Sequence, residues 1–244
     1  MSSTIVSTPV RNAVVVGGAR GIGLATVRRA AGRVGAMTVL DLPEHAPEVA
    51  AQFLGARYER ADVLDPDALH AGFEAAAAHG AVDAVFVPAG VTLPTPLLTT
   101  SAAEAQRCLL TNVLGAVNVI HAAVPHLAPG ASIVLCASVA AYTGGGYVGG
   151  PVYGASKAAV ISLTKGAARE LAPRRVRVNC VAPGCTRTTM LGDDPTVHDE
   201  LARRTLAGRL ADPEEIADGV LFLWSAAASY MTGAVLDVNG GIRL

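Results

Sequence analysis

Residues 12–23 run Asn-Ala-Val-Val-Val-Gly-Gly-Ala-Arg-Gly-Ile-Gly. The apolar run Asn12–Val16 has the length of a buried strand, and residues 21–33 have the pattern of a helix. Glycines at 17, 21 and 23 let the connecting backbone turn tightly and approach a ligand. A helix N-terminus offers free N–H groups and a partial positive charge, both of which suit a pyrophosphate. Because it joins a strand to a helix, the stretch favours a phosphate-binding loop over a glycine-rich turn without a ligand.

The rest of the chain alternates short β-branched runs with alanine-rich helical patterns. We expect strands at residues 12–16, 37–42, 57–61, 82–87, 131–137, 176–182 and 234–238, and helices at 21–33, 66–79, 101–126, 151–172, 196–206 and 213–227. Continuous apolar strands are typical of a sheet that helices cover on both faces. The regular β-then-α order predicts parallel strands with right-handed crossovers. We therefore expect one α/β domain over residues 1–244, a doubly wound Rossmann-type fold with a mostly seven-stranded parallel sheet, whose ligand lies at the carboxyl ends of the strands.

An aspartate ends the second expected strand, in Val39-Leu40-Asp41-Leu42. A carboxylate about 20 residues after such a loop accepts hydrogen bonds from both ribose hydroxyls of the adenosine half and repels a 2′-phosphate. Arg20, in the loop itself, is a basic residue that could meet that phosphate. Placing a phosphate beside a carboxylate costs more than a solvated arginine returns. NAD is therefore predicted rather than NADP, with a simple turn aspartate as the alternative role for Asp41.

Tyr153 and Lys157 stand four residues apart near the start of an expected helix and so share one of its faces. Tyrosine is a poor base at neutral pH, and a neighbouring ammonium favours the phenolate. Pro151 suits a first helical turn, which would bring the positive helix end close to Tyr153. Ser138 follows the fifth strand, where its hydroxyl would donate to a carbonyl oxygen. A surface contact for the Tyr–Lys pair and a turn role for Ser138 are the alternatives.

Taken together, these residues resemble the classical short-chain dehydrogenase/reductase family over nearly the whole chain. The features that come in the family's order are Gly17/Gly21/Gly23, Asp41, Asp62-Val63, Ala89-Gly90, Asn112, Ser138, Tyr153/Lys157, Pro183-Gly184 and the ending Thr232-Gly233 … Asn239-Gly240-Gly241. The joint pattern is far more specific than any single motif. It implies an NAD-dependent oxidoreductase that interconverts a secondary alcohol and a ketone by hydride transfer.

The resemblance also implies residue roles. Tyr153 would be the general acid/base, Lys157 would promote its ionisation and hold the nicotinamide ribose, and Ser138 would polarise the substrate oxygen. Asn112 would support a proton relay through a backbone carbonyl and water, unless it merely faces a helix interface. The implied cofactor-binding set is Gly17, Arg20, Gly21, Ile22, Gly23, Asp41, Leu42, Asp62, Val63, Ala89, Gly90, Tyr153, Lys157, Pro183, Gly184, Thr186 and Thr188.

Within that set, Asp62 and Val63 would contact the adenine. Pro183-Gly184 and Thr188 would meet the nicotinamide carboxamide. Strand-end turns are the alternative for both groups, because Pro-Gly is also a plain turn signal.

Three departures from the family pattern stand out. Val16 replaces the usual threonine, which removes one hydroxyl that ties the loop to the next strand. Pro88 stands in Val87-Pro88-Ala89-Gly90 where Asn-Asn-Ala-Gly is usual, and proline has no backbone N–H to donate. Ser138 and Tyr153 are also about two residues further apart than the resemblance implies. The extra length falls in the glycine-rich residues 143–150, which we expect to be conformationally free and to reshape the substrate mouth.

Residues 186–210 are expected to form a mobile lid, with Met190, Leu191 and Leu206 as apolar substrate contacts or as plain helix packing. The Gly, Met and Val residues near the mouth predict an apolar or cyclic substrate. The resemblance implies a homotetramer built through the two long helices and the C-terminal strand.

Composition argues against several other classes of protein. The 244 residues are 51% hydrophobic and carry a net charge of −1, without a basic stripe for nucleic acid. We expect no membrane span and no signal peptide, because apolar stretches are broken before about 18 residues. The cysteines at 108, 136, 180 and 185 form no C-x-x-C pair, which predicts reduced thiols of a cytoplasmic protein. Six histidines without ligand spacing predict no metal site.

Two other functions are considered. A cofactor-binding sensor or scaffold without turnover is motivated by Pro88 and Val16, but a Ser–Tyr–Lys set would be superfluous in such a protein. A lyase or epimerase that works by transient oxidation usually carries a longer C-terminal substrate region than this chain provides.

Overall fold

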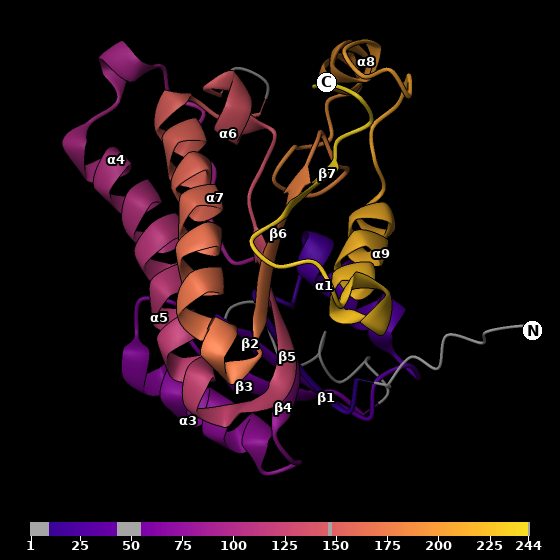
Figure 1. Ribbon diagram of the computed structural model, residues 1–244. Coiled ribbons are helices and arrows are strands. Elements are labelled where there is room, and N and C mark those ends of the chain that lie inside the picture. The colour runs from indigo at the N-terminus through magenta and orange to yellow at the C-terminus, as the bar shows by residue number, and fades with distance from the viewer. Residues whose placement is uncertain (1–9, 43–54, 146–147, 244) are drawn as a thin grey trace, which may run out of the picture.

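A computed structural model describes residues 10–42, 55–145 and 148–243 (Figure 1). Its centre is a seven-stranded sheet with the order β3-β2-β1-β4-β5-β6-β7, and every neighbouring pair is parallel. The strands are β1 Asn12–Val16, β2 Ala36–Asp41, β3 Arg57–Arg60, β4 Val82–Val87, β5 Leu127–Cys136, β6 Arg177–Pro183 and β7 Val235–Val238. The predicted α/β Rossmann-type fold is confirmed.

The strand order reverses between β1 and β4. β1 pairs with β2 on one side and with β4 on the other, and the chain then continues outward to β7. Helices that follow β1 and β4 therefore leave toward opposite faces, and a crevice opens between them at the carboxyl ends of the strands. This switch point positions the ligand site.

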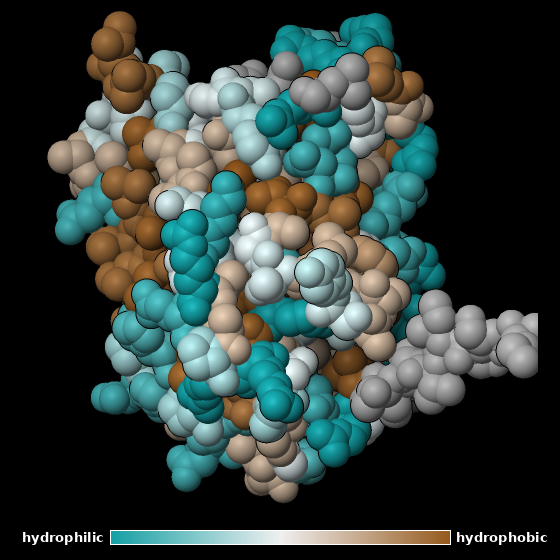
Figure 2. Space-filling model, in the orientation of Figure 1, coloured by the Kyte–Doolittle hydropathy of each residue, from teal (hydrophilic) through white to brown (hydrophobic). Residues whose placement is uncertain are grey.

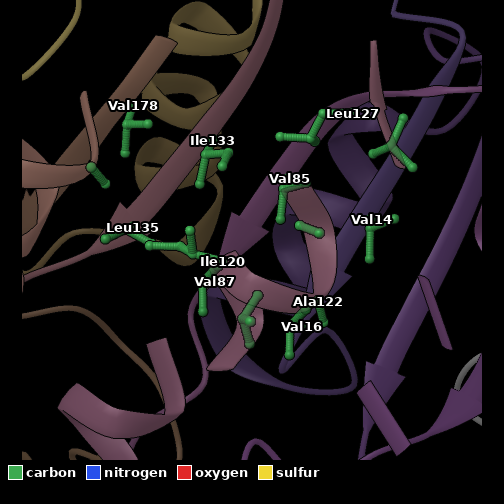
Figure 3. Close-up of a cluster of buried hydrophobic side chains, with 14 of the residues drawn as sticks. Val14, Val16, Val85, Val87, Ile120, Ala122, Leu127, Ile133, Leu135 and Val178 are labelled. Carbon is green, nitrogen blue, oxygen red and sulfur yellow. The ribbon is translucent and has the colours of Figure 1, made fainter. Parts of the chain in front are cut away.

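Two layers of helices cover the sheet. On one face lie α3 (Pro66–Ala77), α5 (Gly115–Ala123) and α7 (Pro151–Leu171), and on the other lie α1 (Gly21–Ala30) and α9 (Pro213–Trp224). Alternate strand residues face the two layers, since successive side chains of a strand point to opposite sides. Figure 3 shows the first layer's core, where strand residues Val14, Val16, Val85, Val87, Ile133 and Leu135 surround Ile120 and Ala122 of α5.

The edge strand β3 differs from the expected pattern of continuous apolar strands. Its sequence is Arg-Tyr-Glu-Arg, and none of the four residues is buried. Among the described residues β3 pairs with β2 alone, so another described strand covers only one of its sides. Charged residues on a short edge strand also discourage pairing with other chains.

The helical stretch predicted at 101–126 contains four segments. They are α4 (Ala102–Leu109), the π turn η3 (Leu110–Leu114), α5 and the short 3-10 turn η4 (Val124–His126). Ser101 starts the stretch with a capping box to Glu104. The backbone N–H of Gly115 bonds to Leu110 O, a spacing of five that leaves one carbonyl of the turn over. Asn112 lies in this π turn.

By length and composition this same stretch is long and apolar enough to cross a membrane, contrary to the expectation from the sequence. Within residues Ala102–His126, an 18-residue window has a mean hydropathy of 1.5, and 44% of that window is buried inside the fold. The apolar residues of α5 belong to the core that α5 forms with α3 and the sheet. The stretch has the packing of a core helix.

Several element boundaries differ from those predicted. α1 ends at Ala30, α8 spans Pro195–Arg203, and α9 ends at Trp224, where the 3-10 turn η6 (Ala226–Ala228) follows. β5 begins four residues early, at Leu127, because a register shift lets Leu127 pair with Val82. The short helix α6 (Ala140–Thr143) was not predicted, and it ends at Gly144, which has a φ of +70°.

Arg177, the first residue of β6, holds the end of α9. Its Nη2 donates to Leu223 O at 2.9 Å, and its Nη1 donates to Ala228 O at 3.0 Å. The last carbonyls of a helix have no intrahelical partner, and a planar guanidinium can serve several of them at once.

Replacing Arg177 by Met is therefore expected to lower the free energy of unfolding by about 2 kcal/mol, because carbonyls at the end of α9 lose charged donors. Urea unfolding followed by circular dichroism measures the change. Arg177→Lys should recover less than half, since an ammonium cannot reach both carbonyls in one plane. A methionine variant as stable as the wild type would contradict this assignment.

Candidate active site

A cavity of about 490 Å³ opens at the carboxyl ends of the central strands. All predicted cofactor-binding residues line it, together with Ser138. Asn112 does not line it and lies buried behind it. The structure thus brings the residues singled out in the sequence to a single place, with Asn112 beneath the surface.

The glycine loop is packed against the neighbouring strands. Gly17 has a φ of +92° and donates its N–H to Leu40 O at 2.7 Å. A Cβ on Gly17 would lie 2.7 Å from Ala89 N, and one on Gly23 would lie 2.0 Å from Gly17 O. These positions need glycine, because a side chain would separate β1 from β4 or the loop from its helix.

Helix α1 begins at Gly21 without a side-chain cap or an acidic residue in its first turn. Its free N–H groups face the cavity through the lining residues Gly21, Ile22 and Gly23. Such a helix end binds a pyrophosphate. The glycine cradle and the uncapped helix fit a dinucleotide cofactor.

The departures at Val16 and Pro88 leave the loop attached to β4. Val16 is 1% exposed and belongs to the core. Ala89 N donates to Val16 O at 3.1 Å, so a backbone bond ties the two strand ends together. Pro88 lines the cavity without an N–H of its own.

Asp41 is fixed at the end of β2. Its Oδ2 accepts a hydrogen bond from Ala19 N at 2.8 Å, and its Oδ1 accepts one from Leu42 N at 2.8 Å. The residue is only 7% exposed. Arg20, in contrast, is exposed and makes no side-chain hydrogen bond to the described part of the chain. The carboxylate is therefore a rigid feature of the cavity, whereas Arg20 is a solvated one.

The next strand end supplies Asp62 and Val63. Asp62 Oδ1 accepts a bond from Leu64 N at 2.9 Å, and Val63 O accepts one from Asn118 Nδ2 at 3.0 Å. Gly115 of α5 allows close packing on Val63, since a Cβ there would lie 2.7 Å from Val63 Cγ2. No local pattern in the sequence pointed to Asn118, because its partner becomes its neighbour only after folding.

The far side of the cavity follows β6. Gly184 packs against the backbone of Asn239, and Thr186 Oγ1 donates to Gly184 O at 3.1 Å. Thr188 comes back to the glycine loop, where a Cβ on Gly21 would lie 3.4 Å from Thr188 Cγ2. The segment after β6 thus lines the cavity and reaches back to the glycine loop at Gly21.

Tyr153 and Lys157 lie in the first turns of α7, and both are buried, at 7% and 5% exposed. Lys157 Nζ donates to Cys136 O at 2.8 Å and lies 5.8 Å from the centre of the Tyr153 ring. This bond places a buried ammonium at the end of β5, beside the tyrosine. Burial raises the pKa of the Cys136 thiol, which keeps this neighbour of the ammonium neutral.

Ser138 ends the loop that follows β5 and is half-buried at the cavity wall. Its Oγ accepts a hydrogen bond from Ala140 N at 3.1 Å. The hydroxyl proton is then available to a ligand oxygen, because the backbone contact uses only a lone pair.

Both polar atoms of the Asn112 side chain are hydrogen-bonded within the protein. Its Oδ1 accepts from Val91 N at 2.8 Å, while its Nδ2 donates to Val91 O and to Ser156 Oγ, both at 2.9 Å. Ser156 in turn donates to Tyr153 O at 2.7 Å. The side chain therefore braces the cavity from behind, and the proton relay that the resemblance implies would have to use the backbone of Asn112.

The glycine-rich residues 143–150 are less free than the sequence predicted. Gly145 N donates to Ala140 O at 3.2 Å, and Gly150 N donates to Leu93 O at 2.6 Å. Gly146 and Tyr147 lie outside the described residues. A glycine-rich composition does not reveal this packing, because glycine is used for close contacts as well as for flexibility.

Of the three lid residues proposed as substrate contacts, Met190 and Leu191 line the cavity and Leu206 does not. Leu206 is 74% exposed, and it lies beside Gly241 of the C-terminal segment. α8 ends at Arg203, so Leu206 falls in the turn beyond it.

Among residues 10–42, 55–145 and 148–243, no three His, Cys, Asp or Glu side chains come together as a metal site. The four cysteines are free and buried.

A family model described as Enoyl-(Acyl carrier protein) reductase matches residues 17–243. Cis-4-hydroxycyclohexanecarboxylate dehydrogenase from Sinomonas cyclohexanicum is 37% identical and is matched over 95% of this chain and 96% of its own. Carbonyl reductase family member 4 from Xenopus laevis is 33% identical, over 94% and 97%. A short-chain dehydrogenase from Burkholderia cenocepacia, solved in complex with NADP, superposes with a TM-score of 0.89 at 30% identity, over 96% and 98%.

The chain belongs to the short-chain dehydrogenase/reductase family. It is an oxidoreductase of the kind that acts on CH–OH groups with a nicotinamide cofactor.

The bracing role of Asn112 predicts a specific loss of stability. Asn112→Leu should lower the free energy of unfolding by about 2–3 kcal/mol, because Val91 loses both backbone partners and Ser156 loses a donor. Urea unfolding gives the value. Asn118→Leu, which removes one bond to Val63 O, is the matched control and should cost about 1 kcal/mol. Equal losses in the two variants would argue against the brace.

Proposed function

We propose that the protein is an NAD-dependent oxidoreductase that interconverts a secondary alcohol and a ketone. One observation carries the proposal. Tyr153, Lys157 and Ser138 converge on the same cavity as the glycine loop and the uncapped end of α1. A cofactor held by its pyrophosphate at that helix would extend toward the tyrosine.

A nicotinamide cofactor, when bound, would supply the hydride acceptor in oxidation and the hydride donor in reduction. In oxidation, the phenolate of Tyr153 takes the alcohol's O–H proton as the carbinol carbon loses its hydride. In reduction, the hydroxyl of Tyr153 gives its proton to the carbonyl oxygen. Ser138 donates a hydrogen bond to the same oxygen and stabilises the charge that develops there.

Lys157 assists Tyr153 by its charge. Its ammonium is held 5.8 Å from the ring centre by the bond to Cys136 O. A positive charge at this position would stabilise negative charge that develops on the tyrosine oxygen during proton transfer. The π turn that contains Asn112 would present a backbone carbonyl for a water-mediated route that returns the proton to solvent.

NAD is the proposed cofactor, and Asp41 supports this choice. Its carboxylate is locked by two backbone N–H groups at the place where the adenosine ribose would lie. A 2′-phosphate there would face a fixed negative charge that cannot swing away. Arg20 is exposed and offsets little of that repulsion.

The proposed substrate is apolar or cyclic. Met190, Leu191, Val139 and Val148 line the cavity near Tyr153, and residues 186–210 would act as a lid over it. The Sinomonas relative acts on a hydroxycyclohexane ring by its name, which fits a compact cyclic substrate.

A homotetramer is proposed as the assembly and the cytoplasm as the location. Hydrophobic surface gathers on the side of the molecule where α4 lies (Figure 2). The exposed leucines are Leu97 and Leu98 in the 3-10 turn η2 (Leu97–Thr99), Leu109 at the end of α4 and Leu114 in η3. Exposed apolar patches of this kind mark contact surfaces between proteins. Free, buried cysteines suit a reducing compartment.

Replacing Tyr153 by Phe is expected to lower kcat roughly a thousandfold, because the proton donor and acceptor is gone. NAD binding, measured by calorimetry, should persist. Tyr142→Phe is the matched control, since Tyr142 stacks with Arg243 and does not line the cavity. If the Tyr153→Phe variant keeps near-normal turnover, the proposed chemistry is wrong. A wild type that binds NAD but turns over no alcohol or ketone would favour the sensor alternative.

Replacing Asp41 by Asn should shift the ratio of NADP to NAD affinity toward NADP by about tenfold, since one negative charge beside the 2′-phosphate is lost. Dissociation constants for both cofactors measure the shift. Asp218→Asn makes the same charge change at a surface ion pair with Arg29 and should leave the ratio unchanged. The NAD assignment would be wrong if the wild type binds NADP more tightly than NAD and the Arg20→Ala variant loses this preference.

A further inference from the structure

The end of the glycine-rich segment, residues 148–150, forms a strap across the substrate end of the cavity. The strap is fixed at both ends to the loop that follows β4. Thr92 Oγ1 donates to Val148 O at 3.2 Å, and Gly150 N donates to Leu93 O at 2.6 Å. A Cβ on Gly150 would lie 2.3 Å from Thr95 O, so the strap lies directly on that loop.

The middle residue of the strap supports Tyr153. A Cβ on Gly149 would lie 2.2 Å from Tyr153 Cδ1 and 2.7 Å from Cγ. Only glycine lets the backbone come this close to the ring. Any movement of the strap toward the cavity is therefore limited by the ring of Tyr153.

Val148 is the strap's side chain over the cavity. It lines the cavity together with Tyr153, Met190 and Leu191. It also packs against the cluster of Cys185, Leu201 and Leu210, to which Leu191 contributes from the lid segment. Val148 therefore bridges from the backbone beside Tyr153 to the apolar underside of the lid.

From these contacts we infer that Val148 limits the size of the substrate that the cavity accepts. Its side chain forms the wall against the substituent on the lid side of the carbinol carbon. The inference rests on the proposed alcohol–ketone function and goes beyond it. Two properties make a side chain a size filter: it lies beside the reacting group, and its backbone does not yield. The hydrogen bonds to Thr92 and Leu93 supply the second property, since they fix the strap at both ends.

The test uses cyclohexanone and 4-alkylcyclohexanones of increasing bulk. Val148→Ala should raise the ratio of kcat/KM for the bulkiest ketone over cyclohexanone by about tenfold, and Val148→Phe should lower it, because a pocket discriminates by roughly that factor per methylene. Val124→Ala deletes the same two methyl groups from η4, away from the cavity, and should leave the ratio unchanged.

A second readout needs no turnover. Calorimetric binding of the same ketones in the presence of NAD⁺, which cannot reduce them, should show the same reordering of affinities in Val148→Ala. Gly149→Ala provides the contrast, because it displaces Tyr153 and should lower kcat alike for small and bulky ketones. Size ratios that stay constant across the Val148 variants, in rate and in binding, would overturn the inference. If no ketone is turned over but the ketone affinities are reordered in Val148→Ala, the proposed function is wrong and the size filter is supported.

Discussion

The hydrogen bond from Lys157 Nζ to Cys136 O is the interaction on which the proposed reacting centre depends. It ties the first turns of α7 to the end of β5 and places a buried ammonium beside Tyr153. Burying a charge is costly unless it is hydrogen-bonded or paired. Here the carbonyl at the strand end holds the ammonium while leaving its charge uncompensated by any carboxylate in the described part of the chain. The buried ammonium of Lys157 therefore gives the site a fixed positive potential, although burying a charge is by itself unfavourable.

A second set of buried polar contacts makes this centre rigid. Val91, Asn112, Ser156 and the carbonyl of Tyr153 are joined by consecutive hydrogen bonds that run from the β4 loop through the π turn to α7. A fully satisfied buried network specifies one arrangement, because each alternative leaves a polar group unpaired. The π turn and the catalytic helix are therefore held in one register. The same β4 loop also carries Thr92 and Leu93, which fix the strap, so the proposed proton-transfer centre and the inferred substrate wall share a single support.

Glycine has two opposite meanings in this chain. At Gly17, Gly23 and Gly149 its absent side chain permits contacts that a Cβ would block, and the backbone there is closely packed. At Gly32, Gly55 and Gly80 no atom of the described residues lies within 4 Å of the missing Cβ, and glycine there suits the positive φ of a turn. Composition alone cannot separate the two cases. This is why residues 143–150 were predicted to be free, although the described part of the segment is fastened to its surroundings.

The sequence by itself determined the order of strands and helices, the parallel sheet and the glycine loop, because these follow from local periodicity and from steric rules for neighbouring residues. It also singled out Asp41, Ser138, Tyr153 and Lys157 as site residues, and the structure brings all four to one cavity. Only the tertiary structure decided what these residues touch. The partners of Asn112, the packing of Asn118 on Val63 and the reach of Val148 to the lid all join segments distant in the chain. The polar edge strand β3 and the π turn likewise reflect neighbours that local pattern does not contain. Contacts between distant segments are set by the packing of the whole fold, and so they cannot be derived from any single stretch of residues.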